Sequence, residues 1–499
     1  MTSFSDIFLL GVFSMMVGFV IWAILTAWKD RHQVEHALLI NFPVIGHLRY
    51  YFEHLGTFFR QYWFAGDDEE RPFSRAVRSQ VYRMSKGISN NLSFGATSSQ
   101  KTEVFRNSLF PLEKGESDDD RSWVIGEDCD FPFEHNRFVN ISGMSFGALS
   151  GNAIAALSMG AASAGMTMNT GEGGRPSEFH RTPEMMDPKN PGSIVVQLGT
   201  ANFGYRDSNG RLDYNKLSEI RDIKKITMTQ IKISQGAKPG LGGILPGAKV
   251  TKEIAELRDV KPGVDCISPS KNPDCAKPES MLHTIRKIKQ VTGKPVGIKL
   301  ALASVEELKQ LLELGIAMDK DIVNGSPSHL PSVITVDGGD GGTGSAPALF
   351  MESLALPVRY IISDVNNALV DLGIRKKVHL VASGRLVTAH DAAIALALGA
   401  DSVESARGFM MSIGCINALT CFSGRCSVGI ATQDKKLQKA LVPESKAKRV
   451  ISYSKSMEKE LFNLALACGL KHPQDLRPKH LVELNKTSSS ERVFFRQES

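Results

Sequence analysis

Eight short runs of β-branched and apolar residues recur between residues 138 and 406, and each is followed by a turn or loop, most of them rich in glycine. The segments between most of these runs have the spacing of amphipathic helices, for example residues 149–165 and 387–400. Strands that alternate with helices form parallel sheets, and eight such units close into a barrel. The predicted strands span residues 138–146, 166–170, 194–198, 226–233, 295–300, 333–337, 378–383 and 402–406.

The predicted fold class is therefore α/β, a (β/α)8 barrel with its ligand site at the carboxyl ends of the strands. A doubly wound open sheet is the alternative, but no predicted strand is followed by a G-x-G-x-x-G turn that opens a helix. The chain has 499 residues, enough for a barrel of about 250 residues and further segments. Its net charge of +6 is small for this length, and its basic residues are scattered, which argues against nucleic-acid binding.

An uncharged run near the N-terminus predicts a membrane tether. Residues 7–28 carry no charge, and a spanning helix needs about 20 apolar residues. No Lys or Arg precedes the run, as one would in a secretory signal. Because Lys29 and Arg31 follow it, the positive-inside rule predicts a single-pass protein with a cytoplasmic catalytic part. A buried helix of a soluble domain is the alternative.

The next stretch mixes aromatic residues with the cations Arg49 and Arg60. It has two interpretations: a juxtamembrane segment at the level of the lipid headgroups, or a set of aromatic side chains that pack against the barrel. The aromatic residues are Tyr50, Tyr51, Phe52, Phe58, Phe59, Tyr62, Trp63 and Phe64.

The predicted domain organisation has four parts. Residues 1–30 are an N-terminal tail and transmembrane helix, and residues 31–120 are a juxtamembrane extension. Residues 121–470 are the barrel with a cysteine-bearing loop, and residues 471–499 are a C-terminal tail. The polar end after Lys486 is expected to fray.

Five loops after predicted strands are rich in glycine: GMSFGALS, NTGEGGRP, QGAKPGLGGILPGAKV, DGGDGGTGSAP and ASGRLV. Glycine lets a backbone approach a ligand closely, and backbone N–H groups bind phosphate. Any one such loop is more often a simple turn. Five of them on one rim favour a phosphate-bearing ligand.

Three of the seven cysteines lie in one loop with C-x5-C-x4-C spacing. An odd, sparse set of cysteines argues against a disulfide framework. A structural zinc site needs four ligands, usually in CxxC pairs, whereas three thiolates suit an iron–sulfur cluster. From spacing alone, three unrelated core cysteines remain the alternative. The three are Cys415, Cys421 and Cys426.

Five long motifs together give the chain a recognisable family. They are SGMSFGALS (142–150), NTGEGG (169–174), QGAKPGLGG (235–243), DGGDGGTGSAP (337–347) and the cysteine loop ending in GIATQD (429–434). Over about residues 120–470 the chain resembles the FMN-binding synthase domain of glutamate synthases, in particular single-domain membrane-associated relatives. The resemblance implies a (β/α)8 barrel with FMN and a [3Fe-4S] cluster. It also implies reduction of the imine of 2-oxoglutarate and ammonia to glutamate.

The resemblance also implies roles for individual residues. Glu172, Lys238 and Arg258 would form the substrate pocket, in which the two cations hold the carboxylates of a dicarboxylic acid. Lys299 would lie at the N1/O2 edge of the flavin and stabilise its reduced anion. The alternative for Glu172, Lys238 and Arg258 is an ordinary ion pair on the rim. The alternative for Lys299 is a rim lysine in water. The implied cofactor-binding residues are Met144, Ser145, Thr170, Gln197, Gln230, Lys232, Lys299, Gly341, Gly342, Gly384, Arg385, Arg407 and Gly408, and the cluster ligands are Cys415, Cys421 and Cys426.

The chain departs from the family's pattern in several places. It begins Met1-Thr2 and has no cysteine before Cys129, so we expect it to lack a glutaminase. Ile244 stands where a polar substrate-pocket residue is expected, and residues 267–275 differ from the family's His-rich segment. These changes put the substrate in doubt. In the cysteine loop, Phe422 and Ser427 replace a histidine and a proline, which bears on the cluster's environment.

The predicted activity is glutamate synthase-like reductive amination of 2-oxoglutarate or a related 2-oxo acid to the amino acid. No dinucleotide fingerprint is visible, so the expected electron donor is a separate protein, a ferredoxin or a reductase subunit. Two alternatives remain: an FMN-dependent dehydrogenase of another amine or hydroxy acid, and a barrel scaffold without catalysis.

Overall fold

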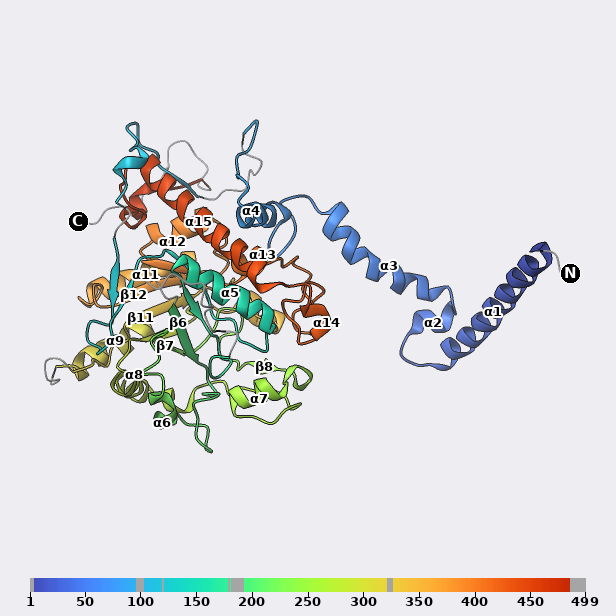
Figure 1. The fold of residues 1–499 in the computed structure, drawn as a ribbon, viewed down its shortest axis with the longest axis horizontal. Helices are drawn as coiled ribbons and strands as arrows, with labels where there is room; N and C mark the ends of the chain where they lie inside the picture. Colours follow the sequence, from blue (N-terminus) through green and yellow to red (C-terminus); the bar gives the residue numbers. More distant parts are fainter. Residues whose placement is uncertain are drawn as a thin grey trace. The chain divides into compact units, whose positions relative to one another are not determined.

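The computed structural model describes residues 4–95, 103–118, 121–177, 180, 193–320 and 326–484. The chain divides into two compact units, residues 1–76 and 77–499. Figure 1 gives the order of their elements along the chain. The expected fraying after Lys486 falls outside the described residues.

The first unit is helical. It contains α1 (Phe4–His32), α2 (Ala37–Asn41), α3 (Gly46–Phe59) and a single π-helical turn, η1 (Arg60–Phe64). Among the described residues, α1 is the one helix long and apolar enough to cross a membrane, with a mean hydropathy of 2.5 in its most apolar window. A signal sequence near an N-terminus has the same properties, so the span itself stays a prediction.

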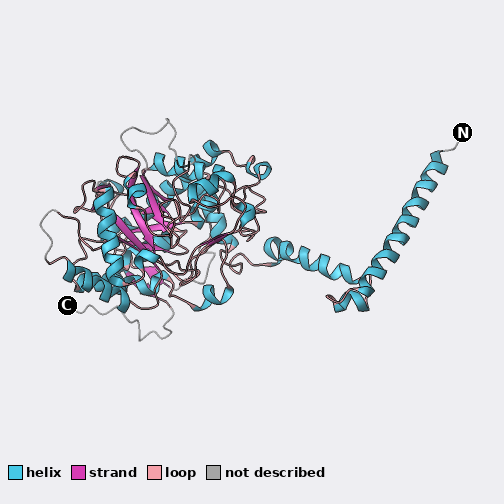
Figure 2. Cartoon of the chain, turned by 90° about the horizontal axis from the view of Figure 1, so that it is seen from below, coloured by secondary structure: helices cyan, strands magenta, loops and turns pink. Residues whose placement is uncertain are grey.

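The second unit is built on a closed barrel of eight parallel strands, in the order β10-β11-β12-β13-β4-β5-β6-β7. All eight predicted strands and the predicted fold class are confirmed. The strands are nearly all buried, because helices cover the outside of the barrel and side chains fill its inside. Figure 2 shows the strands enclosed by helices. Their bounds are β4 (Val139–Ile141), β5 (Thr167–Asn169), β6 (Ser193–Leu198), β7 (Ile226–Lys232), β10 (Val296–Leu300), β11 (Val333–Asp337), β12 (His379–Ser383) and β13 (Ser402–Ser405).

The helices follow the predicted alternation. Residues 149–165 form α5 (Gly151–Ala164), which begins at the Ser150 cap, where the side chain accepts a hydrogen bond from Ala153 N, and ends at Gly165 with φ +69°. The others are α4 (Arg75–Ser85), α6 (Tyr214–Ser218), α7 (Lys252–Arg258), α8 (Pro278–Thr292), α9 (Glu306–Met318), α10 (Ala348–Ser353), α11 (Val358–Asp371), α12 (Ala389–Ala397), α13 (Arg407–Ser412), α14 (Lys435–Gln438) and α15 (Pro443–Ala467). Short 3-10 helices are η2 (Lys114–Glu116), η4 (Gly247–Lys249), η5 (Pro273–Cys275), η6 (Pro473–Asp475) and η7 (Pro478–His480).

The long helix α15 lies directly on α5 (Figure 1). The close approach depends on small residues in α5, because a Cβ atom at Gly160 would stand 2.5 Å from the side chain of Val450. The sequence GNAIAALSMGAASA is therefore explained by packing between helices rather than by ligand binding.

A hairpin closes one end of the barrel interior. It consists of β2 (Trp123–Ile125) and β3 (Phe133–His135), which pair antiparallel. Ile125 belongs to a buried cluster with four residues of the barrel strands, and Trp123 and Phe133 pack against that cluster. The strand residues are Val195, Met228, Val333 and Val381, which precede the carboxyl ends of their strands. The hairpin therefore contributes to stability, and the opposite rim is left for ligands.

Two further strand pairs lie outside the barrel. β1 (Glu103–Phe105) pairs antiparallel with β14 (Leu481–Glu483), so residues of the predicted C-terminal tail join the second unit. β8 (Ile244–Leu245) pairs with β9 (Cys266–Ile267). This second pair borders the pocket described next.

Candidate active site

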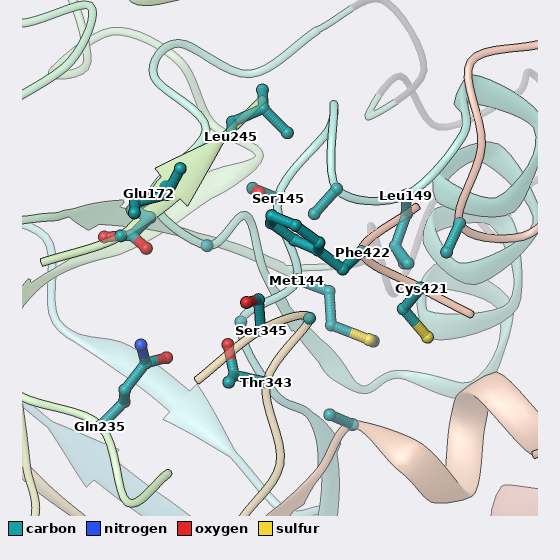
Figure 3. A pocket seen from close by; sticks show the side chains of 18 of the residues that line it. Met144, Ser145, Leu149, Glu172, Gln235, Leu245, Thr343, Ser345, Cys421 and Phe422 are labelled. Atoms are coloured by element: carbon teal, nitrogen blue, oxygen red, sulfur yellow. The ribbon is translucent and has the colours of Figure 1, made fainter. Parts of the chain in front are cut away.

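A pocket lies at the carboxyl ends of the barrel strands, bordered by strand β6 and by loops that follow β4, β5, β7, β11 and β13. Figure 3 shows Cys421 and Phe422 beside Met144 and Leu149 in this pocket. Ten of the predicted site residues line it: Met144, Ser145, Glu172, Gln197, Lys232, Lys238, Arg258, Gly342, Arg407 and Cys421. The remaining predicted residues do not line the pocket; among them Lys299 lies on β10, and Gly384 and Arg385 follow β12.

A layer of amide side chains spans the barrel interior beneath the pocket. Gln230 Oε1 accepts hydrogen bonds from Asn169 Nδ2 at 2.7 Å and from Gln197 Nε2 at 2.8 Å. Gln230 Nε2 donates to Thr335 Oγ1 at 3.0 Å. Because Gln230 bonds to three side chains, it fixes the layer, and Gln197 is the member that reaches the pocket.

Thr170 also acts through Gln197. Its Oγ1 accepts a hydrogen bond from the backbone N–H of Gln197 at 3.1 Å. Thr170 therefore joins the loop after β5 to strand β6. The residues Asn169 and Thr335 were not predicted from the sequence, because their role depends on which side chains meet across the barrel.

One carboxylate lies among several cations in the pocket. Lys232 Nζ is 3.0 Å from Glu172 Oε1. Burial raises the pKa of Glu172, but Lys232, Arg258 and Lys238 together hold it below its usual value. Glu172 is therefore ionised at neutral pH. Burial lowers the pKa of Lys238, although the Glu172 carboxylate opposes that shift.

Two glycines make room for Glu172. A Cβ atom at Gly199 would stand 2.6 Å from Cβ of Glu172, and one at Gly243 would stand 2.6 Å from its Oε1. Side chains at either position would displace the carboxylate. The glycine of the QGAKPGLGG motif at this position thus serves the placement of an acid, rather than a simple turn.

Arg258 is buried at the wall of the pocket. Its Nη2 donates to the carbonyl of Phe146 at 3.1 Å and to Ser145 Oγ at 3.4 Å. Its Nε is buried and has no hydrogen-bond partner within the described chain. Such a group costs free energy unless a water molecule or a ligand accepts its hydrogen bond, so Arg258 fits the role of an anion-binding residue.

Lys299 lies deeper, between two carboxylates at the strand ends. Its Nζ is 3.2 Å from Ser142 Oγ and 3.7 Å from Asp337 Oδ2. Burial raises the pKa of Glu404, and Lys299 opposes that shift. Asp337 and Glu404 were missed from the sequence. The signal was an acidic residue at the end of a buried strand, in VITVD and SVES.

The glycine-rich loop after β11 forms another wall. A Cβ atom at Gly342 would stand 3.1 Å from Arg407 Nη2, and one at Gly341 would stand 2.9 Å from the carbonyl of Gly338. Arg407 Nη2 also donates to the carbonyl of Thr343 at 3.1 Å. The backbone of the loop and the Arg407 guanidinium group thus approach each other closely, an arrangement that suits the predicted phosphate group.

Three predicted cofactor residues lie behind this loop. Gly384 has φ +118°, and its neighbour Arg385, which has φ +50°, interacts with Asp340. A side chain at Gly408 would collide with Tyr453 Oη. Gly408 therefore allows close packing between α13 and α15. It does not line the pocket itself, but it follows Arg407, which does.

The cysteine loop, residues 414–434, carries all three predicted cluster ligands. Burial raises the pKa of Cys415, and Cys421 and Cys426 raise it further. Lys249, which was not predicted, donates from Nζ to the carbonyl of Cys421 at 2.6 Å. Across the described ranges, no three His, Cys, Asp or Glu side chains are arranged to hold a metal ion. The cluster therefore stays a prediction.

The divergent segment 267–275 has structural contacts. Thr200 Oγ1 donates to the carbonyl of Pro269 at 2.6 Å, and Asn272 Nδ2 donates to Asn202 Oδ1 at 2.7 Å. These bonds join the segment to the loop after β6. Ile244, the other departure, lines the pocket and is 53% exposed, so it leaves an apolar surface at the pocket's mouth.

Comparison of the sequence with known proteins identifies the family. A family model described as the conserved region in glutamate synthase matches residues 73–471. The chain belongs to the glutamate synthase family. The glutamate synthase large subunit-like protein YerD of Bacillus subtilis is 37% identical over 516 residues, covering 95% of this chain and 94% of that protein.

The chain spans about three fifths of the length of several other relatives. The archaeal-type glutamate synthase [NADPH] of Thermotoga sp. is 34% identical over 68% of this chain and 61% of its own length. Among solved structures, a lactate oxidase of Pediococcus acidilactici is 13% identical, with a TM-score of 0.44 over 82% of this chain and 94% of that one. The monotopic membrane protein (S)-mandelate dehydrogenase is 11% identical, with a TM-score of 0.46 over 82% and 98%.

Proposed function

We propose that this chain is an FMN- and iron–sulfur-dependent oxidoreductase that reductively aminates 2-oxoglutarate or a related 2-oxo acid. The observation that carries the proposal is a single pocket in which a cationic wall, a glycine-rich loop and Cys421 meet. Membership of the glutamate synthase family supports it, and several relatives are named glutamate synthase [NADPH].

The residues around the pocket suit FMN, and the cysteine loop carries the three thiols that the proposed cluster needs. Gly341, Gly342 and Arg407 suit the phosphate of FMN, and the amide layer and Lys299 suit its ring. Cys415, Cys421 and Cys426 would hold a [3Fe-4S] cluster through three thiolates. When bound, FMN supplies hydride chemistry and the cluster supplies single electrons.

The chain's own residues then bind and orient the substrate. Lys238 and Arg258 are buried cations that bind carboxylate groups through charge-assisted hydrogen bonds. Glu172, ionised beside Lys232, accepts a hydrogen bond or a proton from the substrate nitrogen. The apolar wall of the pocket excludes water and strengthens these interactions.

The electron donor and the membrane belong to the same proposal. The donor is a separate protein, a ferredoxin or a reductase subunit, that delivers electrons to the cluster. Helix α1 spans a membrane with the barrel on the cytoplasmic side, because Lys29 and Arg31 follow its apolar run.

The first experiment measures the visible spectrum, flavin and iron of anaerobically purified full-length protein. We expect bound FMN and about three irons per chain, as three thiolate ligands require. Substrate screening then follows, with a reduced donor for the synthase direction and an artificial acceptor for the dehydrogenase direction. Activity only with another amine or hydroxy acid would establish the dehydrogenase instead. Protein that takes up neither cofactor after reconstitution would refute the proposal.

A further inference from the structure

In the first unit, one side of α3 and η1 is lined by apolar side chains that take no part in the pocket. Apolar side chains recur in α3 and η1 at spacings of three and four residues, which places them along one side of a helix. The positions between them are polar, glycine or Tyr50. We call the following residues the aromatic face: Leu48, Tyr51, Phe52, Leu55, Phe58, Phe59, Tyr62 and Trp63, with Phe64 added for the reason given next.

The π-helical turn extends the aromatic face by one residue. Ala65 N donates to the carbonyl of Arg60 at 2.8 Å, a bond across five residues. Phe64 follows Phe59 by five residues, and their ring centroids lie 6.2 Å apart. In a continuous α-helix, Phe64 would lie beside Arg60 on the polar side. The π turn instead brings Phe64 next to Phe59.

The aromatic face is open to solvent within the first unit. Trp63 and Phe64 are each 72% exposed, and Phe52 is 62% exposed. Aromatic side chains this exposed, and contiguous along one side of a helix, mark an interaction surface. Arg60 lies on the polar side, and Arg49 lies there in an ion pair with Glu53 at 3.1 Å, so the helix presents cations and one carboxylate beside its apolar face.

A buried carboxylate fixes the start of α3 next to the end of α1. Asp30, only 3% exposed, accepts a hydrogen bond from Val44 N at 2.9 Å and contacts His47 Nε2 at 2.9 Å. Asp30 comes two residues after the uncharged run 7–28. The first turn of α3 is therefore held at the level where the apolar part of α1 ends.

We propose that α3 and η1 form an in-plane helix that binds the boundary between the headgroups and acyl chains of a lipid bilayer through the aromatic face. The bilayer is the occupant because the hydrocarbon-length run of α1 ends where α3 is anchored. Trp and Tyr are the residues that favour this boundary, and arginine side chains reach from it to the phosphates. The proposal concerns the first unit; it rests on the membrane-spanning α1 of the proposed function and not on its catalytic part.

The test uses Trp63 as a reporter of depth. The full-length protein carrying Trp22→Phe and Trp28→Phe is reconstituted into phosphatidylcholine–phosphatidylglycerol vesicles, with and without lipids brominated near the top of the acyl chain. The signal of Trp63 is the difference from the same protein with Trp63→Phe added. We expect bromolipids to reduce that signal about twofold or more, because the face of an interfacial helix lies about 5–10 Å deep.

Two variants of the Trp63→Phe protein serve as controls. Thr57→Trp puts the reporter on the polar side, where bromolipids should have little effect and aqueous acrylamide should quench. Phe64→Trp should be quenched by bromolipids, as the π turn requires. Equal quenching at positions 57 and 64 would contradict the placement of Phe64 on the aromatic face by the π turn.

Two results at position 63 would overturn the membrane proposal. Quenching by acrylamide and not by bromolipids would mean that the aromatic face lies in water. Protection from both quenchers would mean that protein covers it, either the second unit or another copy of the chain.

Discussion

Replacing Glu172 by glutamine removes one negative charge from the pocket and keeps the size of the side chain. The carboxylate pairs with Lys232 at 3.0 Å, and the site contains Lys238 and Arg258 as further cations. A substrate carboxylate bound by those two cations is repelled by Glu172. We therefore expect Glu172→Gln to bind a dicarboxylate more tightly and to turn it over more slowly.

The magnitudes follow from the charges. Two like charges about 5–6 Å apart interact by about 3 kcal/mol at an effective dielectric constant of about 20. Lys232 neutralises part of that repulsion, so we expect a gain of about 1–1.5 kcal/mol, or roughly 5–10-fold in affinity. Loss of a proton-transferring group lowers turnover by about 100-fold or more.

The assay separates the two effects. Binding of 2-oxoglutarate is followed by the change in flavin absorbance of the anaerobic protein, and turnover is measured with an artificial reductant. Glu256→Gln, an exposed glutamate on α7, is the matched control and should change neither quantity. If affinity and turnover of Glu172→Gln fall together, Glu172 maintains the structure of the site, and the reasoning is refuted.

Three further predictions follow from the same structure. Gly243→Ala should lower turnover about tenfold or more with flavin retained, because its Cβ would stand 2.6 Å from Glu172 Oε1; unchanged turnover would contradict this placement of the acid. Burial lowers the pKa of Lys238 below the usual 10.5 of a lysine. The residue therefore loses its positive charge at a lower pH than a free lysine, and affinity for 2-oxoglutarate should fall as the pH approaches that pKa. Lys238→Met should remove this pH dependence in binding titrations. Lys289→Met should lower the free energy of unfolding by about 2–4 kcal/mol in denaturant titrations, because it leaves the partly buried carboxylate of Asp128 without the ion pair seen at 2.7 Å.

The barrel could be predicted because its strands are buried on both sides and read as apolar runs. The ends of the apolar runs do not always mark the ends of the strands. The predicted strand 138–146 is confirmed only as Val139–Ile141, since the chain then leaves the barrel to form the loop that contributes Met144 and Ser145 to the pocket. Apolar residues in that loop face the pocket, so hydrophobicity alone does not mark the end of the strand.

The sequence motifs predicted several residues that line the pocket, but they did not reveal the residues that hold the predicted ones in place. Motifs identified Glu172 and Lys238, because residues of a binding loop lie close together in sequence. Asp337, which holds Lys299, could be found only after the strands were brought together, as could Lys249 beside Cys421. The three-residue strand β1 likewise has no local signal strong enough to predict it.

The pairing of β1 with β14 has a consequence for how the protein is made. β1 leaves the ribosome before any strand of the barrel, and its partner follows the last of them. At about 5–20 residues per second, β1 waits roughly 20–80 s for β14. During that time its edge is open to pairing with other nascent chains. A transcript that ends before the codon for Leu481 would leave that edge open permanently, and a quality-control protease would encounter it as an unfinished product.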